Sequence, residues 1–179
     1  MRKSLFVAMI CFAGILITNL SYAQNEFPTR KAFTLTIVVS KDTLYEDNVP
    51  KTPYLVNTSE DKNILQLYPG ESIYLEVQEI QNDSIKKMSV VKENLNPAKT
   101  IQVTFLQAIE KGEHRSMILK ISNPFPKKVG FNALILPLRM GKWEETSVNM
   151  VGPKQMDFET TWDEIIVSIG LEDWIFKDE

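Results

Sequence analysis

Short runs in which apolar and polar residues alternate recur along this chain, and this period of two constrains the fold more than any other feature of the sequence. Successive side chains of a β-strand point to opposite faces, so each run predicts a strand with one buried face. The runs lie at 33–40, 72–78, 85–91, 101–105, 117–121, 129–135, 144–150 and 165–176. We expect about nine or ten short strands, which is typical of an antiparallel sandwich or barrel. Val129, Phe131 and Ala133 are expected to share an inner face.

The turn residues favour two packed sheets. Asn82 and Asp83 predict a β-hairpin over Ser72–Glu93. Pro69 and Gly70 fit a type II turn, which suits a crossing between sheets better than a tight hairpin. The best helix candidate, Gln107–Lys111, is too short for a stable helix. We therefore predict an all-β fold, an immunoglobulin-like antiparallel β-sandwich.

The least regular region, residues 41–61, is expected to be a long excursion between strands, with an edge strand at Tyr54–Val56. A domain boundary there would leave too few residues before it to form a core. The run Leu134–Leu136 breaks the alternation and is expected to be covered by the N-terminal arm or by this excursion.

The N-terminus has the pattern of an export signal. Arg2 and Lys3 precede an apolar run of 13 residues, Leu5–Ile17, and Ser21 and Ala23 place small residues before a cleavage site. We predict a signal peptide over residues 1–23 and one domain over 24–179. The apolar run is too short to span a bilayer, and no membrane span is expected in the mature chain. We therefore expect the protein to be exported, either to a periplasm or out of the cell, and we expect its host to be a bacterium.

Composition excludes several functions. The 179 residues carry a formal net charge of −3, which gives no strongly basic face for nucleic acid. One cysteine, Cys11, lies within the predicted signal, and the single histidine makes a zinc site improbable. No two mature glycines are close enough for a phosphate-binding loop. We expect no metal and no cofactor.

Single residues and pairs with catalytic potential have simpler explanations. His114 lies among charged residues after Gly112 and is expected to be a solvated turn residue. Two serine–lysine pairs, Ser59 with Lys62 and Ser84 with Lys87, have the spacing of a β-lactamase nucleophile motif but lack its companion motifs. We predict no catalytic residue.

Acidic and aromatic residues leave two alternatives open. Asp157, Glu159, Asp163 and Glu164 cluster around Trp162 and could hold calcium, without the spacing of a recognised calcium loop, or a glycosidase acid and base. A solvated acidic rim is the preferred interpretation. Trp162 and Trp174 are expected to pack in or beside the core. Trp143 lies in a polar stretch and is the candidate for contact with a sugar ring.

The main functional prediction is an exported, non-enzymatic protein that binds another protein. The alternatives are a small carbohydrate-binding module that uses Trp143 and a carboxylate-dependent hydrolase near Trp162. The expected partner is thus a protein or a glycan.

Overall fold

The computed structural model describes residues 29–57 and 63–178, and within them the chain is all-β with no helix. The predicted signal peptide, residues 1–23, lies outside the described residues. The strands are β1 (Thr29–Arg30), β2 (Phe33–Ser40), β3 (Thr43–Val49), β4 (Thr52–Pro53), β5 (Leu55–Asn57), β6 (Asn63–Leu67), β7 (Glu71–Gln81), β8 (Ser84–Val91), β9 (Thr100–Glu110), β10 (Glu113–Ser122), β11 (Lys128–Pro137), β12 (Glu144–Thr146), β13 (Phe158–Trp162) and β14 (Ile166–Lys177). Ten of them have five or more residues. Seven of these ten, β2, β7, β8, β9, β10, β11 and β14, coincide with the predicted alternating runs, whereas β3, β6 and β13 do not.

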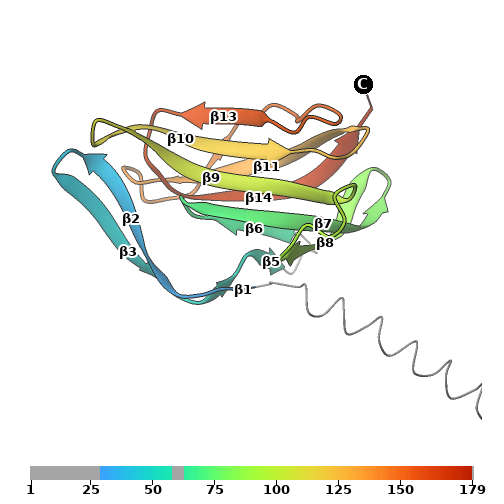
Figure 1. The fold of residues 1–179 in the computed structure, drawn as a ribbon, viewed down its shortest axis with the longest axis horizontal. Helices are drawn as coiled ribbons and strands as arrows, with labels where there is room; N and C mark the ends of the chain where they lie inside the picture. Colours follow the sequence, from blue (N-terminus) through green and yellow to red (C-terminus); the bar gives the residue numbers. More distant parts are fainter. Residues whose placement is uncertain (1–28, 58–62, 179) are drawn as a thin grey trace, which may run out of the picture.

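Every strand pairing is antiparallel, and the arrangement is consistent with a β-sandwich (Figure 1). The largest sheet has the order β12-β11-β14-β8-β7-β9-β10-β13; off this path, β6 pairs with β14 and β5 pairs with β6. Strand β14 pairs with β6 over Ile169–Leu171 but with β8 only at Ile175, which leaves two groups of strands joined weakly. The main core lies between these groups.

The main core takes apolar residues from both groups of strands. Leu65 and Leu171 contribute from one group, and Leu75, Phe105 and Leu119 from the other. Trp162, partly buried, packs against this core, and its indole N–H donates to Thr146 Oγ1 at 3.1 Å. This bond joins β13 to β12, the two ends of the strand order, so Trp162 braces the fold.

A β-bulge in β14 changes which residues of that strand face the core. Asn132 pairs with Glu172 but Gly130 pairs with Ile175, so β14 has one extra residue. Asp173 takes the left-handed conformation with φ 53°, as bulges often require. Leu171 and Trp174 therefore both point inward, although they are three residues apart.

The structure confirms the predicted turns. Asn82 and Asp83, with φ 50° and 58°, connect β7 to β8 as a two-residue hairpin turn. Gly70 has φ 96°, and Glu71 N–H donates to Tyr68 O, so the chain turns there from β6 into β7 and changes group. The helix candidate at 107–111 is the end of β9 and its turn.

Phe131 packs against the main core on the predicted face, with its ring 4.8 Å from the ring of Trp174. It is only partly buried, in contrast to Val129 and Ala133. The bulge in β14 lies opposite this part of β11, between Gly130 and Asn132, but β11 has no extra residue and keeps Val129, Phe131 and Ala133 on one face.

The expectation of an irregular excursion at 41–61 was wrong in its first half. Residues 43–49 form β3, which pairs with β2 in a hairpin separate from the larger sheet. The hairpin lies beside the end of the sandwich that carries the β9–β10 turn (Figure 1). Its apolar residues Leu35, Ile37 and Val49 form a second core with Val167.

This second core explains the apolar run in β11. Leu136 and Leu138 pack against the β2–β3 residues, so the hairpin covers this end of the strand. Leu136 thus packs against a core to which the predicted excursion contributes Tyr45 and Val49 and to which β2, outside both predicted covers, contributes Leu35 and Ile37.

Candidate binding groove beside β2

The hairpin is fastened to the body of the protein by Arg30, whose side chain is 2% exposed. Its Nε and Nη2 donate to the two carboxylate oxygens of Glu71 at 2.8 and 3.1 Å. Nη2 also donates to Gln66 O at 2.6 Å, and Nη1 donates to Thr52 Oγ1 at 2.9 Å and Pro53 O at 3.2 Å. These contacts use all five guanidinium N–H groups, so Arg30 holds the fold together and has no donor left for a ligand.

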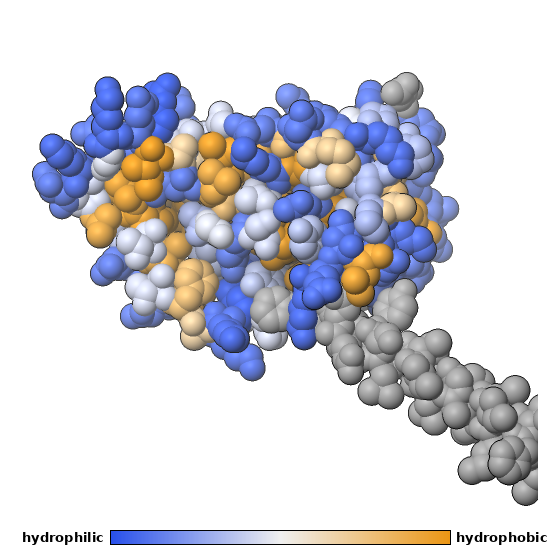
Figure 2. Space-filling model, viewed as in Figure 1, coloured by the Kyte–Doolittle hydropathy of each residue, from blue (hydrophilic) through white to orange (hydrophobic). Residues whose placement is uncertain are grey.

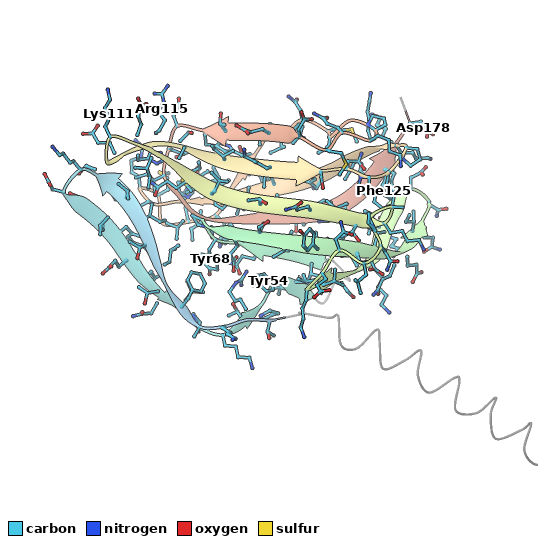
Figure 3. All side chains as sticks on the ribbon, viewed as in Figure 1. Tyr54, Tyr68, Lys111, Arg115, Phe125 and Asp178 are labelled. Atoms are coloured by element: carbon cyan, nitrogen blue, oxygen red, sulfur yellow. The ribbon has the colours of Figure 1, made fainter. Side chains whose placement is uncertain are left out.

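Two tyrosines enclose this arginine. Its guanidinium carbon lies 4.5 Å from the ring centre of Tyr54 and 5.0 Å from that of Tyr68, within the range of cation–π contacts. Figure 3 shows both rings at the foot of the β2–β3 hairpin. Burial raises the pKa of Tyr54 above its ordinary value of 10.0; the Glu71 carboxylate adds to the rise and Arg30 opposes it.

A groove of about 440 Å³ opens next to this cluster, a size within the usual range for ligand sites. One side is β2, which contributes the four consecutive residues Phe33, Thr34, Leu35 and Thr36. The other lining residues are Arg30, Lys31, Tyr54, Pro69, Gly70 and Glu71. We call this the β2 groove. Four consecutive residues of a strand can line a groove together only where the strand presents its edge.

The orientation of that edge follows from Gln107 on β9. Its Oε1 accepts from Val38 N–H at 3.0 Å, and its Nε2 donates to Val38 O at 2.7 Å. A side-chain amide thus pairs with Val38 as a neighbouring strand would, on the side of β2 away from β3. Backbone groups of a strand alternate in direction, so those of Thr34 and Thr36 point the same way as those of Val38.

These groups have no partner among the residues that the structure describes. The register of β2 with β3 is continuous from Phe33 to Val38, and no hydrogen bond reaches the backbone of Thr34 or Thr36 from the body. The edge of β2 in the groove is therefore unpaired over two register positions.

The groove differs in charge from the opposite edge of the hairpin. Lys31 is exposed and has no ion pair among the described residues, whereas the charge of Arg30 is neutralised by Glu71. The outer edge, β3, carries the exposed residues Glu46 and Asp47. Charges on an edge strand discourage pairing, so β2 is the more accessible edge. Figure 2 shows hydrophilic side chains at the hairpin tip and apolar ones where the hairpin meets the body.

His114 is not the solvated turn residue that the sequence predicted. It is the second residue of β10, is partly buried, and both ring nitrogens have partners. Nδ1 lies 2.9 Å from Gln107 Nε2, and Nε2 lies 3.0 Å from Asp163 O. Nδ1 therefore accepts and Nε2–H donates, and His114 helps to orient the Gln107 amide.

Trp143, the sugar-stacking candidate, is 44% exposed. Its ring lies over Gly170 in β14, where a Cβ would meet Ile64, Leu134 and Trp143 at 3.6–3.7 Å. The ring thus covers part of the outer face of β14 and leaves part of its own surface open.

The acidic residues around Trp162 are divided among different surroundings: Asp157 and Glu159 line a shallow pocket of about 260 Å³ beside β10. Glu159 pairs with Lys120 at 3.0 Å, and Asp163 contributes its backbone oxygen to His114. Nowhere in residues 29–57 and 63–178 do three histidine, cysteine or carboxylate side chains gather as metal ligands. Of the serine–lysine pairs, Ser84 and Lys87 lie on β8, and Ser59 and Lys62 lie outside the described residues.

Sequence reasoning missed the residues that shape the groove. Arg30 stands in a polar arm, and Gln107 stands in the segment considered as a helix; neither has a local pattern that marks it.

The described part of the chain also contains no helix able to cross a membrane. Comparisons with models of protein families, with characterised proteins and with solved structures found no match.

Proposed function

We propose that this is an exported, non-enzymatic protein that binds another polypeptide, and that the β2 groove is the contact site. The observation that carries the proposal is the unpaired edge of β2, which lines a groove of about 440 Å³ together with an unpaired lysine. Unpaired backbone groups in a groove can form hydrogen bonds with the backbone of a bound polypeptide.

Two parts of the proposal concern the whole chain. We propose an immunoglobulin-like arrangement, which the antiparallel pairing and the change of strand group at Gly70 support. Export rests on the N-terminal sequence pattern, and the mature protein is expected to begin at Gln24. The intact mass of protein recovered from its host tests this, and an uncleaved or lipid-modified species would contradict it.

Site-specific cross-linking tests the binding site. Cys11 is the only cysteine, so after the expected cleavage an introduced cysteine is the only thiol to carry a photoreactive group. We would label Thr34→Cys in the groove and, as the matched control, Thr161→Cys on the exposed side of β13. We expect one polypeptide to be captured at position 34 and not at 161, and the same polypeptide, once purified, to bind the unmodified protein. Equal capture at both positions would refute the proposal that the β2 groove is the contact site.

A second candidate function is glycan binding at Trp143, which its 44% exposure favours. Tryptophan fluorescence during titration with glycans measures it. Binding that Trp143→Ala abolishes, and that changes in the groove leave intact, would assign the function to Trp143.

A further inference from the structure

We infer that the partner contributes an extended strand, which pairs with the edge of β2 through the backbone groups of Thr34 and Thr36. This inference rests on the proposed function, because it specifies how a polypeptide occupies the β2 groove. It concerns the mode of binding and the kind of sequence that fits.

Gln107 defines where the added strand ends. Its amide already occupies the pairing position at Val38, with both hydrogen bonds formed. An incoming strand therefore meets two open positions, at Thr34 and Thr36, and stops before Val38. At about 3.3 Å per residue, a segment of about five residues spans these positions and their flanks.

The walls of the groove predict the side chains of the partner. Leu35 and Tyr54 are buried and Phe33 is partly buried, so this wall is largely apolar. Thr34 and Thr36 are exposed on the other face of β2. Side chains of an added strand alternate between these two faces, so the partner segment should alternate apolar and polar residues.

Lys31 adds a preference for charge. It lies at the end of the groove next to Arg30, whose own charge is committed to Glu71. An acidic residue at one end of the partner segment would pair with Lys31. The partner is thus an extended, alternating segment with a terminal carboxylate-bearing residue.

The test uses random eight-residue peptides displayed on phage and selected on the protein produced from its full sequence. The best peptide is then synthesised with a single N-methyl group at each position in turn, which removes one backbone donor at a time. We expect affinity to fall about tenfold at alternate positions only, since only alternate N–H groups face β2.

Two proline variants provide the matched comparison. Thr36→Pro removes an N–H that points into the groove and should lower peptide affinity about tenfold or more. Thr36 pairs with Glu46, and both residues direct their backbone groups away from each other. Glu46→Pro therefore places the same ring on the outer edge of the hairpin and should leave peptide affinity unchanged. Circular dichroism and denaturant midpoints establish that both variants are folded.

The outcomes separate the two proposals. If peptides bind but no N-methyl position matters, strand addition is wrong while polypeptide binding stands. If the selection enriches no peptide, both proposals fail. Should Thr36→Pro not fold, the N-methyl series on the unaltered protein still decides the mode of binding.

Discussion

At the scale of single residues, two polar side chains perform tasks usually left to the backbone. Arg30 joins β1, β4, β6 and β7 through five donors. Gln107 takes the place of a strand at Val38. Both roles depend on partners between 22 and 69 residues away in the chain, so no local pattern could have predicted them.

The first prediction concerns Arg30. Arg30→Met should lower the free energy of unfolding by about 3–5 kcal/mol, because it leaves the Glu71 carboxylate, 14% exposed, without the positive charge that neutralises it. The double variant Arg30→Met with Glu71→Met should recover part of this loss, because no uncompensated charge remains. Urea denaturation measures both. A loss below about 1 kcal/mol, as at surface positions, would show that the cluster does not hold the hairpin.

The second prediction concerns pH. Burial, aided by Glu71, raises the pKa of Tyr54 in the folded state above its value when unfolded, near 10.0. The folded state then retains a proton that the unfolded state loses. The contribution of Tyr54 to the free energy of unfolding is fully present below about pH 10, and it is lost as the pH rises through the higher pKa of Tyr54 in the folded state.

Unfolding measured from about pH 8 to 11 tests this expectation. Tyr54→Phe cannot ionise, so its stability should fall less steeply above about pH 10 than that of the unchanged protein. Parallel pH curves for the two proteins would contradict the assignment.

At the scale of elements, the alternation of apolar and polar residues predicted most strands. It failed for strands in which most side chains are exposed on both faces. In β3 only Tyr45 and Val49 are shielded, so its sequence shows no apolar period. The bulge at Asp173 was also missed, because an extra residue in β14 depends on its pairing with β11. The Asn82–Asp83 hairpin was predictable, since its turn residues tolerate positive φ.

The third prediction concerns the β9–β10 turn. Lys111 has φ 55° and Gly112 has φ 84°, so both central residues are left-handed. Asparagine adopts this conformation more readily than lysine, and Asn-Gly is favoured in such turns. Lys111→Asn should therefore raise the free energy of unfolding by about 0.5–1 kcal/mol. A lower denaturation midpoint would contradict this account of the turn.

At the scale of the molecule, the β2–β3 hairpin has one buried face and one free edge. Its apolar face completes a second core with β11 and β14, and its turn at Lys41 lies beside the β9–β10 turn at Gly112. The hairpin is thereby held at both ends, by Arg30 and by Gln107, with the groove between. A fixed edge is better suited to binding than a mobile one, because less ordering is needed when the partner pairs.

Hydrogen exchange of individual amides in the free protein tests the central claim, that β2 has an unpaired edge in the groove. We predict rapid exchange at Thr34 and Thr36 and slow exchange at Leu35 and Ile37, whose amides face β3. Val38 should also exchange slowly, and Gln107→Ala should accelerate it. Protected amides at Thr34 and Thr36 would mean that the edge is already occupied, and would contradict both the groove and the proposed function.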